Sequence, residues 1–250
     1  LANGRASRSK QAAEIWVARG TYEEILVDRF SKAVGSNVEL YGGFGGDESN
    51  KVDPRLYISE TMLVYPHRDF AEEFHKDNWY IAELYGGATI DGFHIFSDYN
   101  YNNHVYSNGR PWPGGVYAKP KDGLGINIRN CIFRNLRDYA IAAYNSNDAP
   151  NSRVINCAFL YLRRAPVEDL GLGSMFINCS FWNVAGWDVR GRNYYFYNCA
   201  WDASVHEGSF WTLGRHLYGD GDDFNRVRNC FFAAGAERTD IYEDDRNNKL

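Results

Sequence analysis

The sequence predicts an all-β fold, a single right-handed parallel β-helix that forms a solenoid of three-strand coils. Three observations predict it: a motif repeated around every cysteine, a repeat length of 20 to 31 residues, and a composition rich in aromatic residues and glycine. The chain of 250 residues contains 18 Tyr, 15 Phe, 7 Trp and 24 Gly. Aromatic side chains favour the pleated surface of a sheet, and glycine marks tight corners. We expect one domain over residues 1–250, with a lead-in at 1–13 and a polar tail at 236–250.

The repeated motif is apolar-x-Asn-Cys-x-aromatic, and each of the five cysteines follows an asparagine. Successive copies are 26, 22, 20 and 31 residues apart, which suits a coil of three short strands and three turns. The Leu-x-x-Leu-x-Leu spacing of leucine-rich repeats is absent, propeller blades need longer periods, and helical solenoids need longer apolar periodicity. The five copies are residues 128–133, 154–159, 176–181, 196–201 and 227–232.

Asparagine has a structural role in this motif, because Asn and Gly tolerate the left-handed backbone conformation that turns a strand sharply. Gly92 occupies the same place in an earlier, degenerate copy, and residues 40–44 are a further candidate copy. Stacked coils should lie about 4.8 Å apart, so the asparagine amides should bond to one another. The expected asparagine ladder is Asn130, Asn156, Asn178, Asn198 and Asn229.

The cysteines and the aromatic residues two positions later should point inward as packing columns, because strand side chains alternate. The cysteines lack the close Cys/His pairs of a zinc site. The net charge is -5 with arginines scattered among acids, so nucleic acid is an unsuitable partner. No apolar run is long enough to cross a bilayer, so we also expect no membrane insertion.

Two segments, residues 97–114 and 202–223, are longer than the repeat requires. Coil counting places both at one corner, about four rungs or roughly 20 Å apart, with a groove between them that suits a linear polysaccharide. The acidic run at 219–223 can form a calcium site or a simple turn. Candidate glycan-binding residues are Tyr101, Trp112, His206 and Trp211, and candidate calcium ligands are Asp220, Asp222 and Asp223.

Glu168 and Asp188 are the candidate catalytic carboxylates, since both lie ten residues before an asparagine of the ladder and should stack on adjacent rungs. With Arg190 nearby, such a pair can act as acid and base on a sugar or bind calcium. The alternative is an exposed charge ladder balanced by arginines. We expect this alternative, with salt-bridged surface carboxylates and no metal between them.

Five further features of the sequence belong together: the opening segment from Glu14 to Tyr22, the Gly-rich segment from Val38 to Glu48, residues 89–93, residues 114–117 and the Asn-Cys repeats. In these segments the chain resembles secreted bacterial parallel β-helix proteins of the pectin-lyase-like superfamily. The resemblance covers residues 14 to 233 and implies the β-helix fold and an extracellular or cell-surface location. The catalytic sets of that superfamily are not assembled here: Asp222-Asp223 is the only adjacent aspartate pair outside the tail and has no partner motifs.

Three functions follow from this reading. The first is an exported, non-catalytic module for surface structure, adhesion or self-assembly into a fibre, with no cofactor and with other copies of itself as partner in a head-to-tail or lateral homo-oligomer. The second is a carbohydrate-active enzyme, a polysaccharide lyase or glycosidase, with calcium as a possible cofactor. The third is a glycan binder similar to phage spikes, with a polysaccharide partner.

Overall fold

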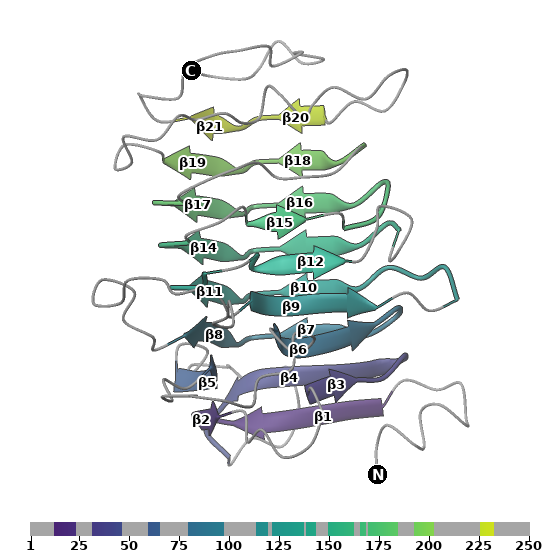
Figure 1. Cartoon of the computed structure of the whole chain (residues 1–250), viewed down its shortest axis with the longest axis vertical. Helices are drawn as coiled ribbons and strands as arrows, with labels where there is room; N and C mark the ends of the chain where they lie inside the picture. Colours follow the sequence, from purple (N-terminus) through teal and green to yellow (C-terminus); the bar gives the residue numbers. More distant parts are fainter. Residues whose placement is uncertain are drawn as a thin grey trace, which may run out of the picture.

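The computed structural model describes residues 13–23, 32–46, 60–65, 80–97, 114–119, 122–137, 139–143, 150–162, 166–168, 170–184, 193–202 and 226–232. The chain is all-β: the described residues form three parallel sheets of stacked strands, an arrangement consistent with a β-helix or solenoid. The strands follow one another up the molecule in chain order, as Figure 1 shows.

The first two sheets each contain eight strands and the third contains five. Sheet I consists, in order, of β1 (Ala13–Ala18), β4 (Val38–Phe44), β7 (Thr89–Asp91), β10 (Asn127–Arg129), β13 (Arg153–Ile155), β16 (Met175–Ile177), β18 (Tyr195–Tyr197) and β20 (Arg226–Arg228). Sheet II consists of β2 (Gly20–Glu23), β5 (Thr61–Tyr65), β8 (His94–Ser97), β11 (Ile132–Arg134), β14 (Ala158–Leu160), β17 (Ser180–Trp182), β19 (Ala200–Asp202) and β21 (Phe231–Phe232). Sheet III consists of β15 (Val167–Glu168), β12 (Ile141–Ala143), β9 (Gly114–Lys119), β6 (Tyr80–Tyr85) and β3 (Lys32–Val34).

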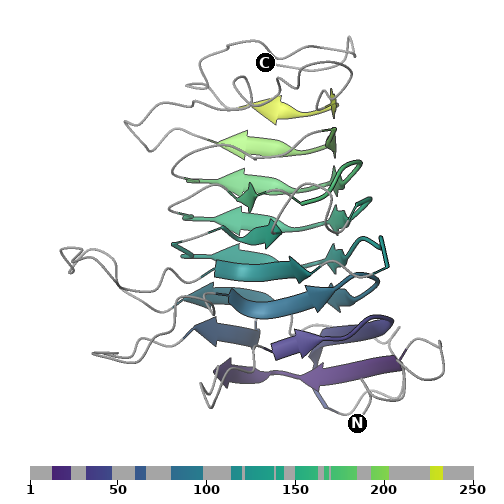
Figure 2. The ribbon, with the colours of Figure 1, turned by 45° about the vertical axis from the view of Figure 1, so that its right-hand side comes forward.

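The chain visits the sheets in the order I, II, III, as the coils β7–β8–β9, β10–β11–β12 and β13–β14–β15 show. Every described pairing is parallel, and the register keeps equivalent residues opposite one another: Phe133 faces Phe159, which faces Phe181. The layered stack is clearest in the rotated view of Figure 2.

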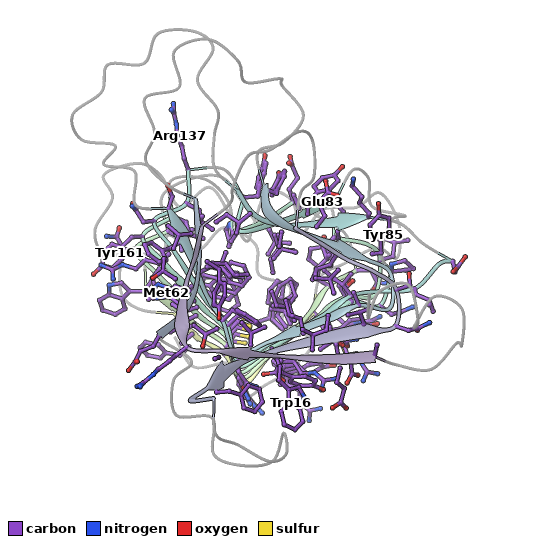
Figure 3. The ribbon with its side chains drawn as sticks, turned by 90° about the horizontal axis from the view of Figure 1, so that it is seen from below. Trp16, Met62, Glu83, Tyr85, Arg137 and Tyr161 are labelled. Atoms are coloured by element: carbon purple, nitrogen blue, oxygen red, sulfur yellow. The ribbon has the colours of Figure 1, made fainter. Side chains whose placement is uncertain are left out.

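The interior is filled by columns of side chains from all three sheets, which Figure 3 shows along the stack. Phe133, Phe159, Phe181 and Trp201 stack with ring centroids 5.1, 4.7 and 4.6 Å apart and interplanar angles of 3°, 5° and 7°. Phe181 is 2% exposed, as the alternation of the motif predicts. Sheet III contributes a column of smaller side chains, Ala82, Val116, Ile141 and Val167.

Between sheets I and II the chain turns at the asparagine of each motif copy. All five asparagines have positive φ, between 50° and 54°, and Gly92 takes the same place with φ 84°. Glycine is needed again at Gly42, since a Cβ there would collide with the carbonyl oxygen of Gly92. The register that pairs Tyr41 with Asp91 brings Gly42 opposite Gly92, but residues 40–44 all belong to strand β4 and the left-handed residue there is Gly43, with φ 88°.

A second left-handed column, which the sequence analysis did not identify, follows the sheet II strands. Asn135, Tyr161 and Asn183 have φ of 53°, 53° and 50° and occupy equivalent positions after β11, β14 and β17. Asn135 donates its side-chain N–H to the carbonyl oxygen of Ser97 at 2.7 Å, one coil earlier. The sequence does carry a signal, because each of these residues lies five positions after an asparagine of the ladder.

Candidate functional site

Several long connections of the chain leave from the carboxyl ends of sheet II strands, whereas residues 45–60 follow β4 of sheet I. Residues 98–113 follow β8, which ends at Ser97, and residues 203–225 follow β19, which ends at Asp202. β8 and β19 are four strands apart in sheet II, so the two insertions leave at one corner with the predicted separation. The corner follows the second strand of each coil, the one after the asparagine. Residues 66–79, between β5 and β6, form a further insertion there that the sequence analysis missed.

Most predicted site residues fall outside the part of the chain that the structure describes. These are the candidate glycan-binding residues Tyr101, Trp112, His206 and Trp211, the candidate calcium ligands Asp220, Asp222 and Asp223, and the candidates Asp188 and Arg190.

Glu168 is described, and it lies on the outer face of sheet III. In β15 it follows Val167, which is fully buried, and it pairs in register with Ala142 of β12. The outward position agrees with the expectation for Glu168, whereas its pairing with Asp188 stays a prediction.

The outer face of sheet III is rich in tyrosine. The rings of Tyr80 and Tyr117 lie 5.0 Å apart at 36°, and they pack against Tyr139 and Ala142, each only 1% exposed. Gly114 makes room for this cluster, because a Cβ at that position would collide with the Tyr80 ring. An outward alanine with almost no exposure means that this side of the sheet is covered.

An ion pair lies on the same outer face of sheet III. Lys119 lies 2.6 Å from Glu83, and its ammonium lies 5.8 Å from the centroid of the Tyr85 ring. Glu83 is only 8% exposed although it points away from the interior (Figure 3). Aromatic rings beside a paired carboxylate can stack on a sugar ring and bond to its hydroxyl groups. The low exposure of Glu83, however, leaves little of this group open to a ligand.

Arg137 marks the corner from which the insertions leave. Figure 3 shows it pointing away from the interior, between sheets II and III, yet it is 8% exposed. The corner and the adjacent outer face of sheet III are thus both covered, which sets them apart from the outer face of sheet II, where Tyr161 and Trp182 are 47% and 48% exposed.

The asparagine ladder has a direction. Asn198 donates to Asn178 at 3.2 Å, Asn178 to Asn156 at 3.1 Å, and Asn156 to Asn130 at 3.2 Å. Asn130 donates to the carboxylate of Asp91 at 2.8 Å, which ends the series. Asn229 shares the left-handed φ of the other four. The ladder amides lie at the surface: Asn130 is half-buried and the other four asparagines are exposed.

The five cysteines are buried free thiols beside the ladder. Burial raises the pKa of the Cys157 thiol well above its ordinary value, and the thiols of Cys131 and Cys179 raise it further. Contacts with the thiols of Cys179 and Cys230 likewise raise the pKa of Cys199. A protonated, buried thiol is a poor nucleophile and a poor metal ligand, so Cys157 and Cys199 serve as packing groups. Hydrogen bonds with the neighbouring thiols lower the pKa of Cys179 and Cys230 instead.

Two general findings apply to the described residues only. They contain no cluster of three or more His, Cys, Asp or Glu side chains with the geometry of a metal site. They also contain no helix with the length and hydropathy to cross a membrane.

Comparison with protein-family models, with curated proteins and with solved structures gave no match to this chain. The functional argument therefore depends on the geometry and the sequence.

Proposed function

We propose that the chain is a right-handed parallel β-helix that acts as an exported, non-catalytic structural module and displays its insertions for attachment to a surface. One observation carries this proposal. The insertions that follow β8 and β19 both begin at the same corner of the stack, and continuous columns of packed side chains connect the coils between them.

The stack between the insertions has the properties of a rigid spacer. Four interior rings from β11, β14, β17 and β19 stack at 4.6 to 5.1 Å, and the asparagine ladder runs beside them. Close-packed interiors transmit strain and resist deformation. With strands about 4.8 Å apart, the four steps from β8 to β19 hold the two insertions roughly 20 Å apart.

The chemistry of the insertions fits adhesion. They contain Tyr101, Trp112, His206 and Trp211, and exposed loops on a rigid scaffold commonly carry binding residues. Aromatic and hydroxyl groups of this kind suit a polysaccharide, so the proposed partner is a surface glycan. The extracellular location within this proposal is supported by the sequence resemblance alone.

The test is to replace residues 98–113 and 203–225, separately, by short Gly/Ser linkers. We expect each variant to unfold in denaturant near the wild-type midpoint and to lose at least tenfold in binding to a panel of immobilised polysaccharides. Replacing residues 144–149, which follow sheet III at a different corner, is the matched control and should leave binding unchanged. Unchanged binding in both insertion variants, or no binding by the wild type, would contradict the proposal.

The enzyme alternative predicts a different result in the same material. Depolymerisation of an acidic polysaccharide by the wild type, abolished in both Glu168→Gln and Asp188→Asn, would replace the structural function by a catalytic one. Absence of turnover across the panel, together with glycan binding, supports the structural module.

A further inference from the structure

We propose that an uncharged linear polysaccharide binds at the corner between the two insertions and stacks on the rings of Tyr161 and Trp182, beside the guanidinium of Arg134. The inference rests on the function proposed above, because it takes a surface glycan as the partner, and it adds the site and the class of glycan. It follows from the exposure of these side chains, from their register and from the backbone of Tyr161.

The three side chains form a row along the stack, at the carboxyl ends of neighbouring sheet II strands. Arg134 is the last residue of β11, Trp182 is the last residue of β17, and Tyr161 directly follows β14. The backbone N–H of Tyr161 donates to the carbonyl oxygen of Trp182 at 3.0 Å, which fixes these two residues on successive coils. β11, β14 and β17 are the strands between β8 and β19, so the row occupies the corner between the insertions that follow those two strands.

Exposure sets this row apart from its surroundings. Tyr161 and Trp182 are both about half exposed, and Arg134 is exposed as well. Figure 3 shows Tyr161 on the outer side of sheet II, pointing away from the interior. The neighbouring outward column has small side chains that cannot cover the rings, namely Ala158, Ser180 and Ala200. Large exposed apolar side chains that lie next to one another mark interaction sites on soluble proteins.

The backbone of Tyr161 indicates that this ring is kept for binding. Its φ of 53° lies in the left-handed region, where the equivalent positions of the neighbouring coils have Asn135 and Asn183. A bulky side chain in that region is strained, whereas asparagine tolerates it. Strained residues of this kind gather at functional sites. The coil therefore has a tyrosine where its own geometry favours asparagine, and because the ring is exposed, packing of the core does not account for it.

The chemistry of the row suits sugar rings. Indole and phenol rings offer flat apolar faces to the C–H groups of a sugar, and guanidinium and phenol groups hydrogen bond to its hydroxyls. Arg134 lies 5.8 Å from the centroid of the Tyr161 ring, so its N–H donors are held beside a stacking surface. The row spans two strand spacings, about 10 Å, so the bound segment is a few linked sugars that run parallel to the stack axis.

Charge and area separate this ligand from other occupants. The chain has a net charge of -5 and the row contributes one cation, so an acidic polysaccharide meets repulsion over most of the protein. A second copy of the chain is also a poorer occupant. Half-exposed aromatic side chains offer on the order of 100 Å² each, whereas a specific protein interface buries about 600 Å² or more from each partner.

The experiment measures binding of the full-length chain to three immobilised polysaccharides, linear xylan and hydroxyethyl cellulose, which are uncharged, and polygalacturonate, which is acidic. We expect the wild type to bind an uncharged polysaccharide more tightly than polygalacturonate. Its affinity should change by less than about twofold at high salt, because stacking is not screened. Trp182→Ala should weaken binding about tenfold and Tyr161→Asn about fivefold, as the loss of aromatic anchors does at other interfaces.

Three further variants or measurements make the result specific. Trp16→Ala is the matched control, since Trp16 is 39% exposed on the outer face of sheet I, away from Tyr161 (Figure 3), and it should leave binding unchanged. Tyr161→Phe keeps the ring and should bind within about twofold of the wild type. Tyr161→Asn relieves the backbone, so it should unfold in urea at or above the wild-type midpoint while it binds more weakly. Trp182 is in ordinary strand backbone, so Trp182→Ala tests the site independently of that strain.

The outcomes separate this inference from the proposed function. Wild-type binding by both Trp182→Ala and Tyr161→Asn overturns the site, as does an equal loss in Trp16→Ala. Tighter binding to polygalacturonate, or loss of binding at high salt, overturns the class of glycan, and a wild type that binds no polysaccharide overturns both. If the insertion replacements bind as the wild type does while the ring variants do not, the role of the insertions fails and the site stands. If only the insertion replacements lose binding, the site fails and the role of the insertions stands.

Discussion

Replacing Asn156 by alanine separates the two roles that the ladder asparagines have, a side chain that bonds along the stack and a backbone in the left-handed conformation. Asn156 donates to Asn130 at 3.2 Å and accepts from Asn178 at 3.1 Å, with φ 54°. Its amide is exposed, so each bond contributes at the low end of the usual range, about 0.5 kcal/mol. Holding alanine in the left-handed region costs a further ~1–2 kcal/mol. We expect Asn156→Ala to lower the free energy of unfolding by about 2–3 kcal/mol.

Asn156→Gly distinguishes the two contributions. Glycine also loses both bonds but adopts the left-handed backbone without strain, and its greater freedom in the unfolded chain costs about 0.5–1 kcal/mol. The glycine variant should therefore be less destabilised than the alanine variant, by about 0.5–1 kcal/mol. Asn127→Ala, at an asparagine within β10, is the control and should change stability by less than about 0.5 kcal/mol.

Urea denaturation followed by circular dichroism measures these differences, provided that the slope of the transition is the same in all variants. If Asn156→Gly proves as destabilised as Asn156→Ala, the left-handed backbone is not what the asparagine supplies. A loss below about 0.5 kcal/mol in Asn156→Ala would refute both parts of the reasoning.

Three further predictions use the same denaturation assay. Phe181→Ala should cost roughly 3–5 kcal/mol, because it empties the middle of a column in which Phe181 stacks on Phe159 and Trp201; a cost below about 1.5 kcal/mol would mean that the column closes over the gap. Tyr161→Asn should be more stable than Tyr161→Ala by about 1 kcal/mol, because φ at this position is 53° and asparagine tolerates it; equal stability would show that the turn carries no strain. Raising the pH above 9.0 should destabilise the protein by up to ~1.4 kcal/mol per pH unit for the Cys157 thiol, because its raised pKa keeps the proton on the folded chain while the unfolded chain releases it. The contribution of the Cys157 thiol to the free energy of unfolding is complete below pH 9.0 and is lost as the pH rises above it. The free energy of unfolding of Cys157→Ala should therefore fall less steeply with pH than that of the wild type. An identical fall in the two proteins would show that Cys157 is not its cause.

The strands on either side of the ladder could be predicted because the same physical requirement recurs in every coil. A left-handed residue must be followed by an inward Cys and an inward aromatic side chain, and this leaves a motif that is visible in the sequence. The third strand leaves no such motif. Gly114–Lys119, Ile141–Ala143 and Val167–Glu168 share only the alternation of an inward apolar residue with an outward one. Their connections also vary in length, so the repeat alone does not give the bounds of these strands.

The surfaces were harder to predict than the core, because outward positions are not constrained by packing. The covered tyrosines of sheet III come from three separate strands and connections, and only the register brings Tyr80 and Tyr117 together. The charge pattern on the outer face of sheet I was accessible in principle. Its outward residues lie one and three positions before each ladder asparagine, so the sequence between Asn127 and Arg228 contains the arginines of the last five strands, whereas the acidic residues Glu14, Glu39 and Asp91 precede it. Identifying that pattern requires the knowledge that these positions face outward on one sheet.

The direction of the ladder depends on a single residue outside the motif. An asparagine amide can donate or accept on either side, so the repeat alone allows the column to run either way. The ionised carboxylate of Asp91 can only accept, and it lies 2.8 Å from the Asn130 amide nitrogen. Asn130 must therefore turn its nitrogen toward Asp91 and its oxygen toward Asn156, and the same choice passes to Asn178 and Asn198 in turn. An acceptor at the start of the column thus sets the orientation of four amides across four coils, although only one of them contacts it.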